Sequence, residues 1–97
     1  MTKEQTKQVV VEKVDLSGEN LADLIVFNDD FNDFDYVVDC FINICKLSYS
    51  EALAKTEYIH HRGIGTVKTG FYNEIKDMKD RLVDCGLTAI VARRSIN

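Results

Sequence analysis

Proline is absent from the 97 residues of this sequence. Its absence excludes a proline-rich ligand segment, a rigid proline linker and a turn built on a native cis-proline. Long apolar runs are also missing: no run exceeds four residues, as in Leu24 to Phe27, whereas a transmembrane helix needs about 20. A net positive charge is also absent, since 16 acidic residues outnumber 12 basic ones and the formal net charge is -4. Such a chain has no general attraction to nucleic acid or to anionic membranes, and we expect neither as a partner.

Cysteine is sparse and irregularly spaced. The three cysteines, Cys40, Cys45 and Cys85, cannot all pair within one chain, and no two of them form a Cys-x-x-Cys motif. Residues 1–8 are polar and lack the apolar core of a secretion signal. These features predict a cytoplasmic protein with reduced thiols, most of which serve as small core residues.

The length and composition suit one compact domain. Hydrophobic residues make up 45% of the chain and charged residues 29%, so a core can form beneath a solvated surface. Residues 1–20 are rich in Lys, Glu, Gln and Thr, and they predict a flexible N-terminal tail. Residues 21–97 are expected to form the folded domain.

Apolar periodicity and turn residues predict three strands and three helices in the order βααβαβ. Strands are expected at 24–27, 64–69 and 87–92, and helices at 34–45, at 49–62 and between Asn73, as N-cap, and Gly86. This order suits an α/β (α+β) two-layer sandwich, in which a three-stranded sheet carries the three helices on one face.

The residues at the helix ends and on the helix faces support these boundaries. Asp33 is a candidate N-cap, Ser48-x-x-Glu51 matches a capping box, and Gly63 is a candidate C-cap. Helical spacing predicts inward stripes on the second and third helices: Tyr49, Ala52, Leu53, Thr56, Ile59 and His60 on the second, and Ile75, Met78, Leu82 and Cys85 on the third.

The most polar stretch is 28–35, which holds four aspartates and two asparagines directly after the first strand. One interpretation is a calcium loop, because four residues fall at positions 1, 3, 5 and 12 of an EF-hand pattern: Asn28, Asp30, Asn32 and Asp39. That pattern fails at position 6, where Asp33 stands in place of glycine. The other interpretation is a turn stabilised by local hydrogen bonds. We expect no metal ion.

The sequence lacks the signature of an enzyme. Zinc binding through Cys40, Cys45, His60 and His61 matches no tetrahedral spacing. A Cys/His nucleophile is disfavoured because Cys40 and Cys45 lie in an apolar stretch. We therefore expect neither a cofactor nor catalysis. His60 still stands out, because its helix face should pack near Asn28 at the start of the acidic turn.

Four stretches resemble the ClpS family, the adaptors of the Clp protease. Residues 24–31 (LIVFNDDF) resemble its NDD segment, residues 59–63 (IHHRG) its helical histidine segment, and residues 65–70 with 86–89 a variant found in part of the family. The resemblance covers about residues 21–92. It implies a non-catalytic adaptor that binds the N-terminal residue of N-degron substrates, typically Leu, Phe, Tyr or Trp, and delivers them to an AAA+ unfoldase of the ClpA or ClpC type.

The resemblance also implies roles for individual residues. Asn28, Asp30 and His60 would bind the substrate's α-amino group. The pocket for its first side chain would be formed by Val26, Asn32, Phe34, Val37, Thr56 and Ile59. Glu74 and Lys79 would contact the unfoldase, and the tail, residues 1–20, would engage its pore region.

This sequence departs from the family at two places in the expected pocket. Asn32-Asp33-Phe34 stands where the family usually has Thr-Pro-Met, and Thr56 stands where a methionine is common. A phenylalanine and a threonine are less adaptable than two methionines, so the preferred first residue remains open. Two alternatives to the adaptor function also remain: a ribosome-stalk-like domain that binds a protein factor without recognising a chain end, and a calcium-binding module.

Overall fold

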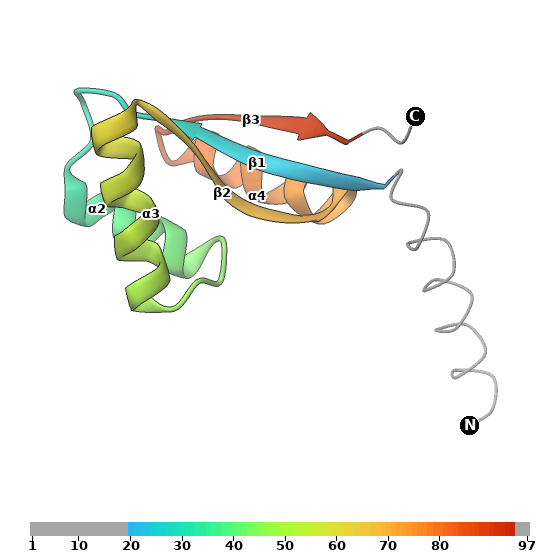
Figure 1. The fold of residues 1–97 in the computed structure, drawn as a ribbon, viewed down its shortest axis with the longest axis horizontal. Coiled ribbons are helices and arrows are strands. Elements are labelled where there is room, and N and C mark those ends of the chain that lie inside the picture. Colours follow the sequence, from blue (N-terminus) through green and yellow to red (C-terminus); the bar gives the residue numbers. More distant parts are fainter. Residues whose placement is uncertain (1–19, 95–97) are drawn as a thin grey trace.

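The computed structural model describes residues 20–94 of the chain, so the predicted tail lies outside the described residues apart from Asn20. The predicted order of elements, βααβαβ, is confirmed (Figure 1). The elements are β1 (Leu21–Phe27), α2 (Phe34–Asn43), α3 (Tyr49–Arg62), β2 (Ile64–Phe71), α4 (Tyr72–Asp84) and β3 (Thr88–Arg93).

The central strand β1 pairs antiparallel with both neighbours, giving the sheet order β2-β1-β3. Its side chains alternate between the faces of the sheet, and Ala22, Leu24 and Val26 are buried on the same side. Between Leu24 and Ile25 the pairing with β2 shifts by one residue, which leaves Val67 in a β-bulge. Val67 is only 2% exposed, so the irregularity brings one more apolar side chain into the core.

The helices cover one face of this sheet, and α2 and α3 pack together at the end where β1 finishes (Figure 1). Phe41 of α2 and Leu82 of α4 are 0% exposed, and Ile75 of α4 is 1% exposed. On the opposite face Ile90 remains 46% exposed. The predicted two-layer sandwich is therefore confirmed. Among residues 20–94, no helix has the length and apolar character needed to cross a membrane.

The boundaries of α3 agree with the sequence prediction. Ser48 Oγ accepts from the Glu51 N–H at 3.1 Å, and the Glu51 carboxylate accepts from the Ser48 N–H at 3.0 Å, which completes the capping box. Gly63 ends the helix with a left-handed φ of 89°, a conformation that favours glycine. Asp33 occupies the N-cap position of α2, although its side chain makes no capping hydrogen bond.

The predicted start of α4 is wrong. The helix begins at Tyr72, directly after β2, with Phe71 as its N-cap, so Asn73 lies inside the helix. Contacts from distant residues hold this start: the Tyr72 N–H donates to the Asn20 carbonyl, and the Arg93 guanidinium lies 4.0 Å from the centre of the Tyr72 ring. Such tertiary contacts override the local preference of asparagine for an N-cap.

Three residues placed inward by helical spacing are exposed: Tyr49, His60 and Cys85. Tyr49 is 65% exposed because it is the first residue of α3, outside the packed part of the helix. Cys85 is exposed because α4 ends there and the chain turns at Gly86, whose φ is 96°.

Helix α2 is also shorter than predicted: it ends at Asn43, and Cys45 is buried in the segment that follows. The three strands run from 21–27, 64–71 and 88–93, each differing from the predicted bounds.

A polar network ties the strands together on the open face. The carboxylate of Asp23 accepts from Thr69 Oγ1 at 2.6 Å and from Arg94 Nη2 at 3.0 Å. The Thr69 hydrogen bond lowers the pKa of Asp23 most strongly; burial opposes it, and the Arg94 guanidinium lowers the pKa further. Asp23 therefore links β1 to β2 and to the segment after β3.

We predict that Asp23→Asn lowers the free energy of unfolding by about 1 kcal/mol at neutral pH. Because the folded-state pKa lies below the ordinary value of 3.8, ionised Asp23 stabilises the fold above that pH, and this contribution is lost as the pH falls through the folded-state pKa. The difference between wild type and variant should thus shrink in acid. Urea denaturation at stepped pH measures it, with exposed Asp39→Asn as the matched control. A difference that persists undiminished in acid would contradict this role.

Candidate functional site

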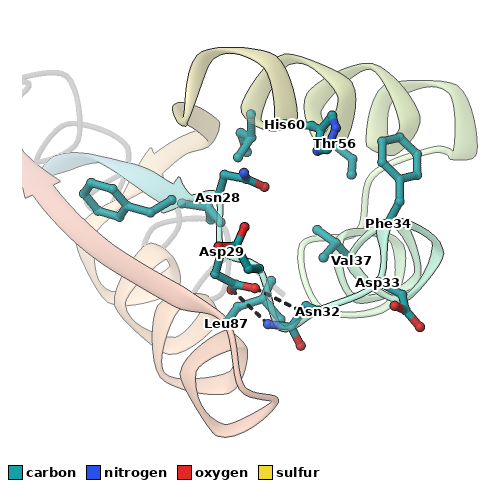
Figure 2. A pocket seen from close by; sticks show the side chains of 13 residues that line it. Asn28, Asp29, Asn32, Asp33, Phe34, Val37, Thr56, His60 and Leu87 are labelled. Atoms are coloured by element: carbon teal, nitrogen blue, oxygen red, sulfur yellow. Dashed lines mark hydrogen bonds between the residues drawn. The ribbon is translucent and has the colours of Figure 1, made fainter.

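A pocket of about 330 Å³ opens where the end of β1 meets α2, α3 and the chain entering β3 (Figure 2). Its walls combine an apolar part with the polar turn that follows β1. No lysine or arginine is among its lining residues, whereas three aspartates are. The lining residues are Val26, Phe27, Asn28, Asp29, Asp30, Asn32, Asp33, Phe34, Val37, Thr56, Ile59, His60 and Leu87.

The turn after β1 is shaped by the carboxylate of Asp29. Its Oδ1 accepts from the backbone N–H groups of Phe31 and Asn32, both at 2.9 Å, and its Oδ2 accepts from Asn32 Nδ2 at 2.9 Å. Burial alone raises the pKa of Asp29, but the hydrogen bonds from Asn32 and Phe31 outweigh it and hold the pKa below its ordinary value. Both carboxylate oxygens of Asp29 therefore accept hydrogen bonds that stabilise the turn.

The residues on either side of Asp29, Asn28 and Asp30, also line the pocket. The backbone N–H of Asn28 donates to the Gly63 carbonyl at 2.9 Å, which fastens the end of β1 to the end of α3. The side chain of Asn28 then points toward His60 on the last turn of that helix (Figure 2). Asn28, Asp30 and His60 are all exposed, and their side chains make no hydrogen bond within the described residues 20–94.

The inward position predicted for His60 is wrong. Ile59 takes the buried place, at 4% exposure, and the next residue along the helix lies about 100° further round. His60 therefore sits exposed at the rim of the pocket. Its ring meets the Phe34 ring edge-on, with centroids 6.2 Å apart and an interplanar angle of 84°. The structure thus brings His60 to the turn, as expected, but on the pocket side instead of in the core.

The six residues expected to hold a side chain all line the pocket. Val26 is 2% exposed, and Thr56 and Ile59 are 4% exposed, so they form its closed end. Phe34 and Val37 are half-buried. The hydroxyl of Thr56 donates to the Ala52 carbonyl at 2.7 Å, so its one polar donor is used within the helix. The remaining member, Asn32, is half-buried and differs from the others because its amide is engaged in the turn.

Sequence reasoning missed four lining residues: Phe27, Asp29, Asp33 and Leu87. Leu87 is 5% exposed and reaches the pocket from the turn before β3, distant in sequence from the other walls. No local signal marks it. Asp29 could have been found, because an aspartate in a polar turn often hydrogen-bonds the backbone two and three residues later.

The predicted unfoldase contacts lie elsewhere. Glu74, in the first turn of α4, is exposed, and the Lys79 ammonium lies 2.8 Å from the Asp80 carboxylate on the same helix. Neither residue lines the pocket. The structure therefore separates this pair from the residues assigned to peptide binding.

Candidate metal ligands are not gathered in the described part of the chain. Residues 20–94 contain no group of three or more His, Cys, Asp or Glu side chains placed to hold a metal ion. Both oxygens of Asp29 already accept hydrogen bonds from the turn. What the pocket does offer is a set of unpaired acceptors, Asn28, Asp30 and His60, beside an apolar hollow. This arrangement can bind a small cation that donates several hydrogen bonds and carries an apolar group.

Comparisons with known proteins agree with this geometry. Residues 17–89 match the family model described as ATP-dependent Clp protease adaptor protein ClpS. ClpS2 of Agrobacterium tumefaciens, solved with bound L-phenylalaninamide, matches with a TM-score of 0.73 and 15% sequence identity, over 78% of this chain and 99% of that one. At that identity the match shows a shared fold. A search of curated protein sequences found no match. Because the family model spans well over half of the sequence, the chain belongs to the ClpS family of Clp protease adaptor proteins.

Proposed function

We propose that this protein is an adaptor that captures proteins by a free N-terminal residue and presents them to the unfoldase of a Clp protease. The observation that carries the proposal is the position of three acceptors, Asn28, Asp30 and His60, at the mouth of an apolar pocket, none with a side-chain hydrogen bond to another residue in 20–94. Membership of the ClpS family supports the same function.

The chemistry of a chain end fits these acceptors. A free α-amino group has a pKa near 8, so at neutral pH it is a cation with three N–H donors. The Asp30 carboxylate supplies negative charge, the Asn28 amide oxygen is a neutral acceptor, and His60 accepts when its ring is neutral. Each hydrogen bond to a charged group contributes about 1.5 to 3 kcal/mol. An acetylated terminus has neither the charge nor the donors, so it should be rejected.

The apolar half of the pocket would hold the side chain of the first residue. A volume of about 330 Å³ accommodates a Leu, Phe, Tyr or Trp side chain together with the amino group. Burying a Leu or Phe side chain contributes about 1.5 to 3 kcal/mol. The fold match supports this assignment, because L-phenylalaninamide, the ligand of the Agrobacterium protein, combines a free amino group with an aromatic side chain.

Capture of this kind requires no catalytic step by the adaptor. Burial raises the pKa of the Cys45 thiol to about 11 and also raises the pKa of Cys40, so both thiols are poor nucleophiles at neutral pH. Cys40, Cys45 and Cys85 are all free thiols, which suits a reducing cytoplasm. We therefore assign the protein a binding function in the cytoplasm.

Delivery would use a second surface. We assign Glu74 and Lys79 on α4 to contact with an AAA+ unfoldase of the ClpA or ClpC type. Because neither residue lines the pocket, the protein could hold substrate and unfoldase at the same time. Lys79 also pairs with Asp80 on the same helix, at a solvated surface where such a pair contributes little to stability.

We predict that peptides with a free N-terminal Phe or Leu bind, and that the same peptides with an acetylated terminus bind at least about 100-fold more weakly, because they lose several charge-assisted hydrogen bonds. Fluorescence anisotropy with C-terminally labelled peptides measures both affinities. Binding of the free peptide should also weaken as the pH rises above about 8, where the amine loses its proton. Equal binding of both peptides would refute recognition of a chain end and favour a general protein-interaction domain.

Variants of the two surfaces serve as controls for each other. Asp30→Ala and His60→Ala should each weaken peptide binding about tenfold or more, and, because both residues are exposed, circular dichroism should show a folded domain. The double variant Glu74→Ala/Lys79→Ala should bind peptide normally and lose affinity for the isolated unfoldase in a pull-down. An unfolded His60→Ala would indicate a structural role for the histidine. Loss of peptide binding in the α4 variant would contradict the separation of the two surfaces.

A further inference from the structure

The end of α4 is held by two side chains from the segment that follows β1. Asn32 Nδ2 donates to the Gly86 carbonyl at 3.0 Å, and the Tyr36 hydroxyl donates to the Cys85 carbonyl at 2.7 Å. The last carbonyls of a helix have no partner within the helix, so they are available to such donors. We call these two side chains, Asn32 and Tyr36, the clamp.

The amide of Asn32 joins two turns. A carboxamide nitrogen carries two hydrogens, and here one is directed to Asp29 Oδ2 at 2.9 Å and the other to the Gly86 carbonyl at 3.0 Å. The dashed lines in Figure 2 mark the Asp29 side of this arrangement, and they show the amide directed at the turn. Asn32 therefore lines the pocket and also links the turn after β1 to the turn after α4.

The two residues that Asn32 links, Asp29 and Gly86, are next to different parts of the pocket: Asp29 to the polar acceptors and Gly86 to the apolar wall. Asp29 lies between Asn28 and Asp30, the acceptors proposed for the ammonium, so its orientation sets theirs. Gly86 directly precedes Leu87, which is 5% exposed and closes the apolar part of the pocket. A shift of the α4–β3 turn would move Leu87, and a loosened Asp29 would move the acceptors.

We propose that Asn32 and Tyr36 are positioning residues that align the amine-binding turn with the apolar wall at Leu87. The proposal rests on the function proposed above. It assigns to Asn32 a part that a hydroxyl or an apolar side chain at this position could not perform, since neither offers two donors from one nitrogen. Tyr36 reinforces the alignment from the first turn of α2, where its side chain is 42% exposed and reaches the end of α4.

Two substitutions test the clamp. Asn32→Ala should reduce the affinity for a peptide with a free N-terminal Phe about tenfold, and Tyr36→Phe, which removes one hydroxyl and keeps the ring, should reduce it about threefold. Asn43→Ala, an exposed asparagine at the end of α2, is the matched control and should bind as the wild type does. Anisotropy is measured well below the melting temperature of every variant.

A spectroscopic measurement separates positioning from general destabilisation. In an NMR titration of side-chain carboxyl signals, Asp29 should titrate below 3.8 in the wild type, and Asn32→Ala should raise that pKa because a donor to the carboxylate is lost. Asn43→Ala should leave it unchanged. This readout needs no ligand, so it tests the clamp even if the peptide experiment fails for the wild type.

Several results would overturn the proposal. Wild-type affinity in Asn32→Ala, or an unchanged Asp29 pKa in that variant, would show that the amide does not position the turn. If Asn32→Ala fails to fold, Tyr36→Phe decides the question, and affinity equal to that of the wild type would then overturn the proposal. A different result would refute the proposed adaptor function itself: wild-type protein that binds the free and the acetylated peptide equally.

Discussion

The carboxylate of Asp29 is the contact on which the candidate site depends. It accepts three hydrogen bonds from the two residues that follow Asp30, which folds the polar chain after β1 into one defined turn. Without that turn, Asn28 and Asp30, on either side of Asp29 in the sequence, would point in no fixed direction. With it, Asn28 and Asp30 face a common pocket and remain free to accept hydrogen bonds. The charge that holds the turn is thus distinct from the groups that we propose bind the substrate's amine.

The scaffold explains why the turn lies beside a histidine and an apolar hollow. β1 is the central strand, and the N–H of Asn28, directly after β1, donates to the Gly63 carbonyl at the end of α3. This hydrogen bond brings the turn close to His60. Gly63 makes this possible because its left-handed conformation ends α3 and leads directly into β2. The buried ends of β1 and α3, Val26 and Ile59, then form the closed end of the pocket.

Local sequence patterns predicted the order of the elements, and the family resemblance named nine of the residues that line the pocket. Neither predicted long-range contacts. The capping box at Ser48 and the C-cap at Gly63 depend on neighbouring residues, and both are confirmed. The start of α4 at Tyr72 depends on contacts with distant segments, and the prediction was wrong there. The exposure of Cys85, also predicted wrongly, follows from the end of α4 and the turn at Gly86. The same limit applies within the site. Leu87 and the bond from Asn32 to Gly86 join residues far apart in sequence, and periodicity carries no information about such pairs.

The central claim is that a positive chain end is bound at the turn after β1. Amide chemical shifts recorded while a short peptide with a free N-terminal Phe is added test this claim directly. The account predicts that the largest changes fall on residues 28–32, on Ile59 and His60 and on Leu87, and that the acetylated peptide leaves these signals in place. Changes confined to the open face of the sheet or to α4, or the same changes with the acetylated peptide, would contradict it.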